Sequence, residues 1–294
     1  MKNASGSLML MMAALIWGGA FVAQRSGMDF IGPMTFQSVR MLLGFLVLLP
    51  VVLLRRKKLG AAFRMPSPKA WLSCGLFLTG ATAVQQIGLI TVPAGKAGFI
   101  TAMYVVLVPL LGVFLGRPTN RRTWIGVVLA VVGLYLLSSI SSLSVSSGEV
   151  LIMLCALLFA LQILSIDRFA PDCDGVALSC MEFLVAGLIP LPIALISEHP
   201  QWSQIWDART AILYTGVLSC GVAYTLQVLG QRRTAPALAS LIMSLESVFS
   251  LIFGALLLHE TLTGKELLGC ALMLTAVILS QLSEVRQAAD AHTA

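Results

Sequence analysis

Three charged side chains stand inside long apolar runs of this sequence, namely Arg40, Glu182 and Glu246. A charge at the centre of a lipid bilayer costs about 2.5–3.5 kcal/mol on insertion scales, so such residues are rare and face the interior of a helix bundle. There a guanidinium can bind a carboxylate, and a carboxyl group can bind an amine or a proton. We therefore expect any chemistry of this protein to depend on these three residues.

Each charge also has a structural explanation, and both explanations stay open. In the functional one, Arg40 binds a substrate carboxylate while Glu182 binds an amine or a proton. In the structural one, the two form an ion pair, or each charge caps the opposite repeat. Glu246 lies beside Ser244 and Ser247 in an apolar run. Apolar surroundings favour the protonated form of a carboxyl group, which suits a proton site. A neutral Glu246 hydrogen-bonded to a neighbouring helix is the alternative.

Neutral polar and aromatic residues occur in the same apolar runs. Amide and phenol groups can orient a polar ligand in an apolar pocket, and they can equally join helices to one another. With Arg40 and Glu182, the predicted substrate-binding residues are Trp17, Gln85, Gln86, Tyr104, Tyr224 and Gln227. The predicted proton-coupling residues are Glu182 and Glu246.

The sequence lacks the residue patterns of an enzyme or a metalloprotein. His199, His259 and His292 fall in predicted loops or the tail, and no run contains paired carboxylates or a metal-ligand cluster. The six cysteines fit no zinc spacing and are interpreted as small membrane-core residues. No G-x-x-x-x-G-K-[ST] loop is present for a nucleotide. We therefore predict no enzymatic activity, no metal and no cofactor.

The composition requires a lipid environment. Hydrophobic residues make up 58% of the 294 residues and charged residues only 11%, whereas soluble domains carry about 25% charged residues. The net charge of +6 comes from short loops, without the basic stripe of a nucleic-acid-binding protein. The chain therefore belongs in a membrane.

The apolar runs predict ten transmembrane helices, because about 20 residues cross the bilayer core. The runs do not alternate as barrel strands do. The first run lacks a convincing cleavage site, so it is interpreted as a span and not as a signal peptide. The predicted spans are 8–24, 33–54, 71–90, 95–115, 124–139, 149–165, 176–196, 211–229, 235–258 and 267–282.

Basic residues set the expected orientation. Lys and Arg gather on the side of the N-terminus, above all in the connection 55–69, while the other side has Arg25, Lys96, Arg209 and Lys265. The positive-inside rule predicts that both termini are cytoplasmic. Residues from about Val285 onward are expected to be a short, frayed cytoplasmic tail.

The two halves of the chain resemble each other at an offset of about 142 residues. At this offset Arg40 falls on Glu182, and Gln85 falls on Gln227. Each half holds five predicted spans, an odd number, so the second half must enter the membrane from the opposite side. Such an inverted repeat is typical of secondary transporters with a substrate site near the midplane. The predicted division is 1–142, 143–284 and a tail at 285–294.

Several short motifs of the sequence are shared with a known family: Ile16–Val22, Phe36–Arg40, Ala97–Thr101, Tyr104–Pro109, Ser244–Phe249, Leu258–Thr263 and Gly269. With these motifs the chain resembles the ten-helix permeases of the drug/metabolite transporter superfamily, which are built from two EamA-type domains. The resemblance covers essentially the whole chain. The family often has Pro where Ser247 stands, which puts a kink there in doubt.

The resemblance implies two bundles, spans 1–4 and 6–9, around a central cavity, with spans 5 and 10 at the periphery. It also implies export of amino acids, drugs or related metabolites. We expect an all-α secondary transporter of the bacterial inner membrane that exports or exchanges small metabolites by alternating access. An intramembrane lipid-processing enzyme and a lipid-linked-sugar flippase are the alternatives.

The expected partners follow from this assignment. They are a small-molecule substrate, the lipid bilayer and, as the candidate coupling ion, protons. No nucleic-acid partner is expected, and the expected oligomeric state is a monomer or a weak dimer.

Overall fold

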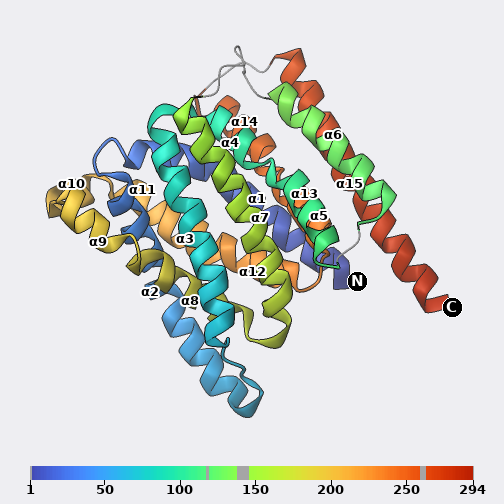
Figure 1. The fold of residues 1–294 in the computed structure, drawn as a ribbon, viewed down its shortest axis with the longest axis horizontal. Coiled ribbons are helices and arrows are strands. Elements are labelled where there is room, and N and C mark those ends of the chain that lie inside the picture. Colours follow the sequence, from blue (N-terminus) through green and yellow to red (C-terminus); the bar gives the residue numbers. More distant parts are fainter. Residues whose placement is uncertain (1, 117–118, 138–145, 259–262, 294) are drawn as a thin grey trace.

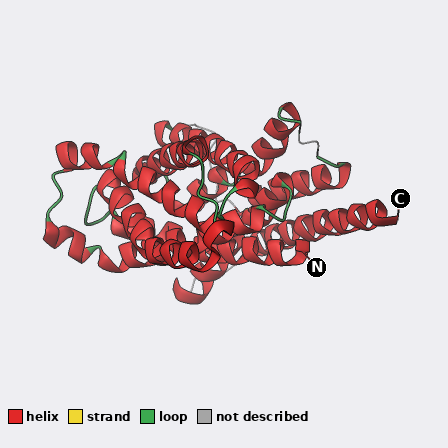
Figure 2. Ribbon diagram, turned by 90° about the horizontal axis from the view of Figure 1, so that it is seen from below, coloured by secondary structure: helices red, strands yellow, loops and turns green. Residues whose placement is uncertain are grey.

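Helices form nearly all of the structure, a computed structural model that describes residues 2–116, 119–137, 146–258 and 263–293. Figure 2 shows helices joined by short loops, and none of these described residues forms a strand. The all-α fold class is confirmed.

The elements of the two halves follow the same order. The first half contains α1 (Lys2–Gly27), α2 (Pro33–Leu59), the 3-10 turn η1 (Gly60–Ala62), α3 (Pro68–Thr91), α4 (Ala94–Thr101), α5 (Tyr104–Phe114) and α6 (Arg121–Leu137). The second half begins with α7 (Ser147–Phe169), the 3-10 turn η2 (Ala170–Asp172), α8 (Gly175–Leu188), α9 (Leu191–Ile193) and the π-helix η3 (Ala194–Glu198). It continues with α10 (Trp202–Asp207), α11 (Arg209–Leu213), the π-helix η4 (Tyr214–Tyr224), α12 (Thr225–Gln231), α13 (Pro236–Met243), α14 (Glu246–Leu258) and α15 (Gly264–Thr293).

The helices agree with the predicted spans. Within the described residues, 9 helical segments are long and apolar enough to cross a membrane. The remaining predicted span corresponds to α6, which has 17 described residues and reaches about 26 Å at 1.5 Å per residue. The arrangement is therefore the expected ten-helix one.

Local signals in the sequence start several of these helices. Pro33 and Pro68 occupy first-turn positions, where the missing N–H would have no partner. Ser146 and Glu149 form a capping box at α7. The Asp174 carboxylate caps α8 by accepting from the amides of Val176 and Ala177 at 3.0 and 3.1 Å.

Glycine contacts show that the second half is inverted relative to the first. A Cβ on Gly88 would lie 3.0 Å from the Gly148 carbonyl oxygen, and a Cβ on Gly6 would lie 3.0 Å from the Gly230 carbonyl oxygen. Gly6 and Gly148 are equivalent in the repeat, as are Gly88 and Gly230. The same close contact thus occurs twice with the partners exchanged, once at the N-terminal end of α1 and once at the N-terminal end of α7.

Each helix packs against the partners that this symmetry demands. Helix α2 packs on α8 and α6 on α15, which are pairs of equivalent elements, and the contact of α5 with α13 is matched by that of α14 with α4. Helix α3 packs on α7 as η4 and α12 pack on α1. In Figure 1, α6 and α15 lie side by side at one edge of the bundle, so spans 5 and 10 are peripheral, as the resemblance implies.

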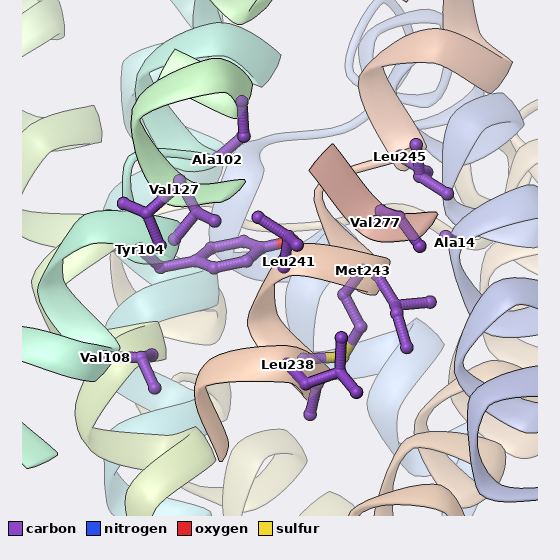
Figure 3. Packing of buried hydrophobic residues seen from close by; sticks show 14 of the residues in the cluster. Ala14, Ala102, Tyr104, Val108, Val127, Leu238, Leu241, Met243, Leu245 and Val277 are labelled. Atoms are coloured by element: carbon purple, nitrogen blue, oxygen red, sulfur yellow. The ribbon is translucent and has the colours of Figure 1, made fainter. Parts of the chain in front are cut away.

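The largest apolar cluster lies where the two halves meet at α5 and α13. It joins Tyr104 and Val108 of α5 to Leu238, Leu241 and Met243 of α13, all buried. Figure 3 shows the Tyr104 ring directed from α5 toward this part of α13. The cluster fixes the position of the helix breaks described below.

Three features differ from the expectations or lie outside them. Helix α15 continues to Thr293, so the backbone of the expected frayed tail is helical, contrary to the prediction. Helix α10 is a short surface helix that corresponds to none of the predicted spans. The predicted division at 142/143 and His259 lie outside the described residues, so the division stays a prediction.

Candidate functional site

A cavity of about 40 Å³ lies between the two repeats. Nearly all of its lining side chains are buried, and its volume has room for only a few water molecules. Its lining residues are Trp17, Ala20, Phe21, Gln24, Arg40, Gln85, Thr101, Tyr104, Phe159, Ile163, Ser219, Tyr224, Gln227, Met243 and Glu246. Both repeats contribute, as expected for an inverted-repeat transporter.

Arg40 of α2 is a buried cation that lacks an acidic partner. It is 2% exposed, and its Nε and Nη2 donate to Oε1 of Gln37 at 3.3 and 2.8 Å. Gln37 in turn donates to the hydroxyl of Thr82, and the Phe36 ring lies 5.7 Å from the guanidinium carbon. No carboxylate of the described residues lies within ion-pair distance of Arg40. The predicted structural ion pair with Glu182 is therefore wrong.

Such a cation is only partly stabilised, because neutral partners do not balance its charge. A buried charge that lacks a counter-ion is costly. An anionic group that entered the cavity would supply the missing charge to Arg40. Arg40 is therefore the residue best suited to hold a carboxylate.

Tyr104 and Glu246 face each other across the cavity from equivalent positions. The Tyr104 hydroxyl donates to Oε1 of Glu246 at 3.2 Å, across a sequence separation of 142 residues. Each residue begins the second part of a broken span, after the α4–α5 break in one repeat and the α13–α14 break in the other. The repeat thus brings a phenol and a carboxyl group together at its own centre.

The break before Glu246 forms without proline. The Ser244 hydroxyl donates to the Leu241 carbonyl at 2.8 Å, and the Ser240 hydroxyl donates to the Ala237 carbonyl at 2.9 Å. The helical break lies at residues 244–245, between the end of α13 and the start of α14, and Ser247 lies within the first turn of α14.

Several polar atoms around the cavity lack hydrogen bonds. Trp17 Nε1, Gln24 Oε1 and Gln227 Oε1 are buried and have no hydrogen-bond partner among the residues that the structure describes. Buried polar groups in native proteins nearly always have a partner, so each such atom needs an explanation. A polar ligand or water in the cavity would satisfy them. The Trp17 ring itself packs edge-on against Tyr224 at 4.8 Å.

Glu182 does not line the cavity. It is fully buried on α8 and accepts a hydrogen bond from Nε2 of Gln162 at 3.4 Å. Gln162 Oε1 accepts from Nε2 of Gln227 at 3.1 Å, and Gln227 does line the cavity. The prediction that Glu182 contacts the substrate directly does not fit this structure, because the Gln162 amide lies between the Glu182 carboxylate and the lining residue Gln227.

Gln86 also lies outside the cavity lining. It is fully buried, and neither of its amide atoms has a partner in the described part of the chain. The adjacent Gln85 does line the cavity and donates to the Thr101 hydroxyl at 3.2 Å. Neighbouring helical residues point in different directions, so only one amide of the pair can reach the site.

The other predicted binding residues line the cavity between the two repeats. Trp17, Arg40, Gln85, Tyr104, Tyr224 and Gln227 line the cavity together with Glu246. Their roles in binding and proton coupling stay predictions.

The sequence interpretation missed Gln24, Thr101, Ser219 and the wall residue Gln162. Gln24 ended the first predicted span and was taken as its polar flank. A Thr or Ser in an apolar run carries little signal of its own. The polar positions of two spans that face each other are matched only by the tertiary structure.

No described residues form a group of three or more His, Cys, Asp or Glu that could hold a metal ion. The six cysteines are free thiols, five of them buried, in agreement with their interpretation as core residues. The site therefore offers an amide, phenol, guanidinium and carboxyl lining for an organic ligand.

Fold and site together define a multi-pass membrane transporter. The chain belongs to the EamA-like transporter family, whose model matches it twice, over residues 4–139 and 146–282. This family groups transporters, not enzymes, so the alternative of a lipid-processing enzyme is set aside.

Similar proteins carry transporter names. An "Uncharacterized transporter" of Archaeoglobus fulgidus is 29% identical over 287 residues, which cover 96% of this chain and 87% of that protein. The threonine/homoserine exporter RhtA of Escherichia coli K12 is 28% identical over 281 residues, 94% of this chain and 90% of RhtA. The inner membrane transporter YedA of the same organism is 25% identical over 278 residues, 92% of this chain and 88% of YedA. A solved crystal structure aligns with a TM-score of 0.81 at 19% identity, over 97% of this chain and 99% of that one, and so supports the fold.

Proposed function

We propose that this protein exports or exchanges small zwitterionic metabolites, with amino acids as the first class, across the bacterial inner membrane. The observation that carries the proposal is the unpaired Arg40 in the same cavity as the Glu246 carboxyl group. A zwitterion has a carboxylate for the first and an ammonium for the second. The name of RhtA supports amino acids as the class to test first.

The same proposal includes the orientation. Both termini are cytoplasmic, because the basic connection 55–69 lies on the side of the N-terminus. The name of YedA supports the inner membrane as the location. Energy comes from an ion gradient or from the gradient of the substrate.

Counterflow in proteoliposomes tests this function. Vesicles loaded with unlabelled L-threonine are diluted into labelled L-threonine, and a panel of other amino acids is then used as competitors. We expect saturable accumulation with wild-type protein and none with Arg40→Ala, while Arg56→Ala is the matched control because Arg56 is an exposed residue of the same helix. If folded wild-type protein moves no member of the panel, the substrate class is wrong.

A further inference from the structure

Glu182 is connected to the cavity by two amide side chains. Its Oε2 accepts from Gln162 Nε2 at 3.4 Å, and Gln162 Oε1 accepts from Gln227 Nε2 at 3.1 Å. All three side chains are at most 2% exposed. The chain of hydrogen bonds begins at a titratable group behind the wall and ends at a residue of the cavity lining.

The first repeat has no such connection. The residue equivalent to Gln162 is Ala20, which cannot hydrogen-bond through its side chain. Gln85, equivalent to Gln227, donates to the Thr101 hydroxyl instead. The connection is therefore not imposed by the repeat but is a feature of the second half alone.

An ionised Glu182 fixes the direction of every bond in this chain. A carboxylate can only accept, so Gln162 must direct its NH2 toward it. The Gln162 carbonyl oxygen then faces Gln227, which must donate. Gln227 Oε1 is left as the acceptor without a partner. The cavity thus receives an acceptor, which suits the ammonium group of a zwitterion.

A protonated Glu182 permits the opposite direction. Its carboxylic O–H can donate to Gln162 Oε1 after the amides of Gln162 and Gln227 each rotate by half a turn. Gln162 Nε2 then donates to Gln227 Oε1, and the NH2 of Gln227 remains for the cavity. One proton from water enters and only hydrogen bonds are exchanged. The cavity would then receive a donor, which repels an ammonium group.

We propose that Glu182 is a remote proton switch that sets the polarity of the cavity through Gln162 and Gln227. This inference rests on the proposed function, since it needs a substrate with an ammonium group. Proton uptake by Glu182 when the cavity opens weakens the hold on the substrate, and proton loss restores it. Influx of a proton thereby drives release of the substrate, although Glu182 never touches it. Glu182 and Gln162 are positioning residues in this scheme.

Other titratable and charged groups lie on the elements that pack around Glu182. Helix α3 brings the Cys74 thiol against the carboxyl group. Helix α2 brings Arg40, which is bonded to Gln37, and Arg55, which pairs with Asp174 at the start of α8. Asp172 and Cys173 precede α8, and α9 and α12 contain no titratable side chain.

The first experiment measures binding of labelled L-threonine to purified protein in mildly acidic and mildly basic buffer. We expect wild-type protein to bind about tenfold more tightly in the basic buffer, the effect of one charge-assisted hydrogen bond. Glu182→Gln and Gln162→Leu should each lose this tenfold difference and keep only the pH dependence that Glu246 contributes from within the cavity. Gln86→Leu is the matched control, because Gln86 is a buried amide outside this chain of bonds, and it should behave as wild type.

A second measurement needs no substrate. Infrared difference spectra between the two buffers should contain a carboxylic-acid C=O band that is absent in Glu182→Gln. This band should shift in Gln162→Leu and also in Gln227→Leu, although Gln227 reaches the carboxyl group only through Gln162.

The outcomes separate the switch from the proposed function. Gln162→Leu that keeps the wild-type pH dependence of binding, or a band that Gln227→Leu leaves unmoved, overturns the switch. If no amino acid binds but the band shifts in both Gln variants, the connection stands and the substrate class fails. Loss of pH dependence in Glu182→Gln alone would show that Glu182 acts without the amides, which also contradicts the proposal.

Discussion

Equivalent residues of the two repeats are placed differently, and the difference separates the two ends of the bundle. At the end where α3 finishes, Lys96 forms an ion pair with Glu149. Arg25 Nη1 donates there to the carbonyls of Leu89 and Val92, both at 3.3 Å. Charged side chains thus join the helices of this end, which we call the latched end.

The opposite end has the same fold but other side chains. Leu238, Ser7 and Asp167 stand where the latched end has Lys96, Glu149 and Arg25. A cavity of about 730 Å³ lies there, lined by residues that include Asp167, Gln231 and Leu238. We call this the hollow end. An inverted repeat has two such ends, and their side chains decide which of them is closed.

The centre of the molecule shows the same divergence. Arg40 and Glu182 are equivalent, yet Arg40 lines the central cavity while Glu182 lies behind Gln162. Tyr104 and Glu246, by contrast, meet as symmetry partners. The repeat therefore gives the two halves equivalent backbone positions, whereas the transport function depends on the pairs of equivalent positions whose side chains differ.

The largest expected effect comes from the divergent pair at the centre. Arg40→Ala should lower threonine counterflow at least about a hundredfold, because a desolvated charge contact is worth 2–5 kcal/mol. Glu182→Gln should lower it only a few-fold at its best pH. Arg40→Lys should recover little, since a compact ammonium does not replace the planar guanidinium. Equal losses in Arg40→Ala and Glu182→Gln would contradict the difference in placement.

The symmetric pair gives the next effect. Glu246→Tyr should lower transport strongly, because it places two phenols where one phenol donates to a carboxylate. Tyr104→Glu combined with Glu246→Tyr exchanges the partners and keeps the hydrogen bond, so it should recover several-fold in rate, or about 1 kcal/mol. Initial counterflow rates of the single and double variants measure this. A double variant no better than Glu246→Tyr would show that the two positions are not interchangeable.

Removing the charges of the latched end should have a smaller effect. Lys96→Leu with Glu149→Ser copies the residues of the hollow end and removes about 1 kcal/mol of stabilisation from the latched state. The opened population should rise about fivefold. Alkylation of a cysteine at position 92, now buried as Val92, in a cysteine-free background reports the opening. Lys57→Leu, an exposed change at the other end, should leave the labelling rate unchanged.

The smallest effect on transport is expected at the periphery. A Cβ on Gly133 would lie 2.8 Å from the Gly269 carbonyl oxygen and 2.7 Å from Met273 Cγ, whereas a Cβ on Gly264 meets nothing within 4 Å. Gly133→Ala should therefore destabilise the α6–α15 pair by about 1–3 kcal/mol and lower the Tm. Transport per folded molecule should be kept, and Gly264→Ala should match wild type in both measurements. A loss of transport at unchanged Tm would show that α6 takes part in the transport cycle.

Much of this architecture is readable from the sequence. Long apolar runs specify helices, because backbone groups cannot remain unpaired in lipid. The offset that places Arg40 on Glu182 predicts the inverted repeat. Charges in apolar runs predict Arg40 and Glu182 on opposite faces of the cavity and Glu246 as a proton site, and of these Arg40 and Glu246 line the cavity whereas Glu182 does not. The helix breaks were harder to predict, since neither the break before Tyr104 nor the one before Glu246 has a proline at the break itself.

The sequence by itself determined that this chain crosses a membrane about ten times in two related halves, because hydrophobic length and spacing are local properties of the chain. Only the tertiary structure decided that Glu182 reaches the cavity through two amides and that Arg40 has no acidic partner. It also decided which end is latched. These properties depend on the rotation of each helix about its axis and on contacts between residues that lie 20 to 67 positions apart in the sequence. The packing of helices against one another sets both the helix rotations and these contacts. Such packing cannot be read from any short stretch of the sequence.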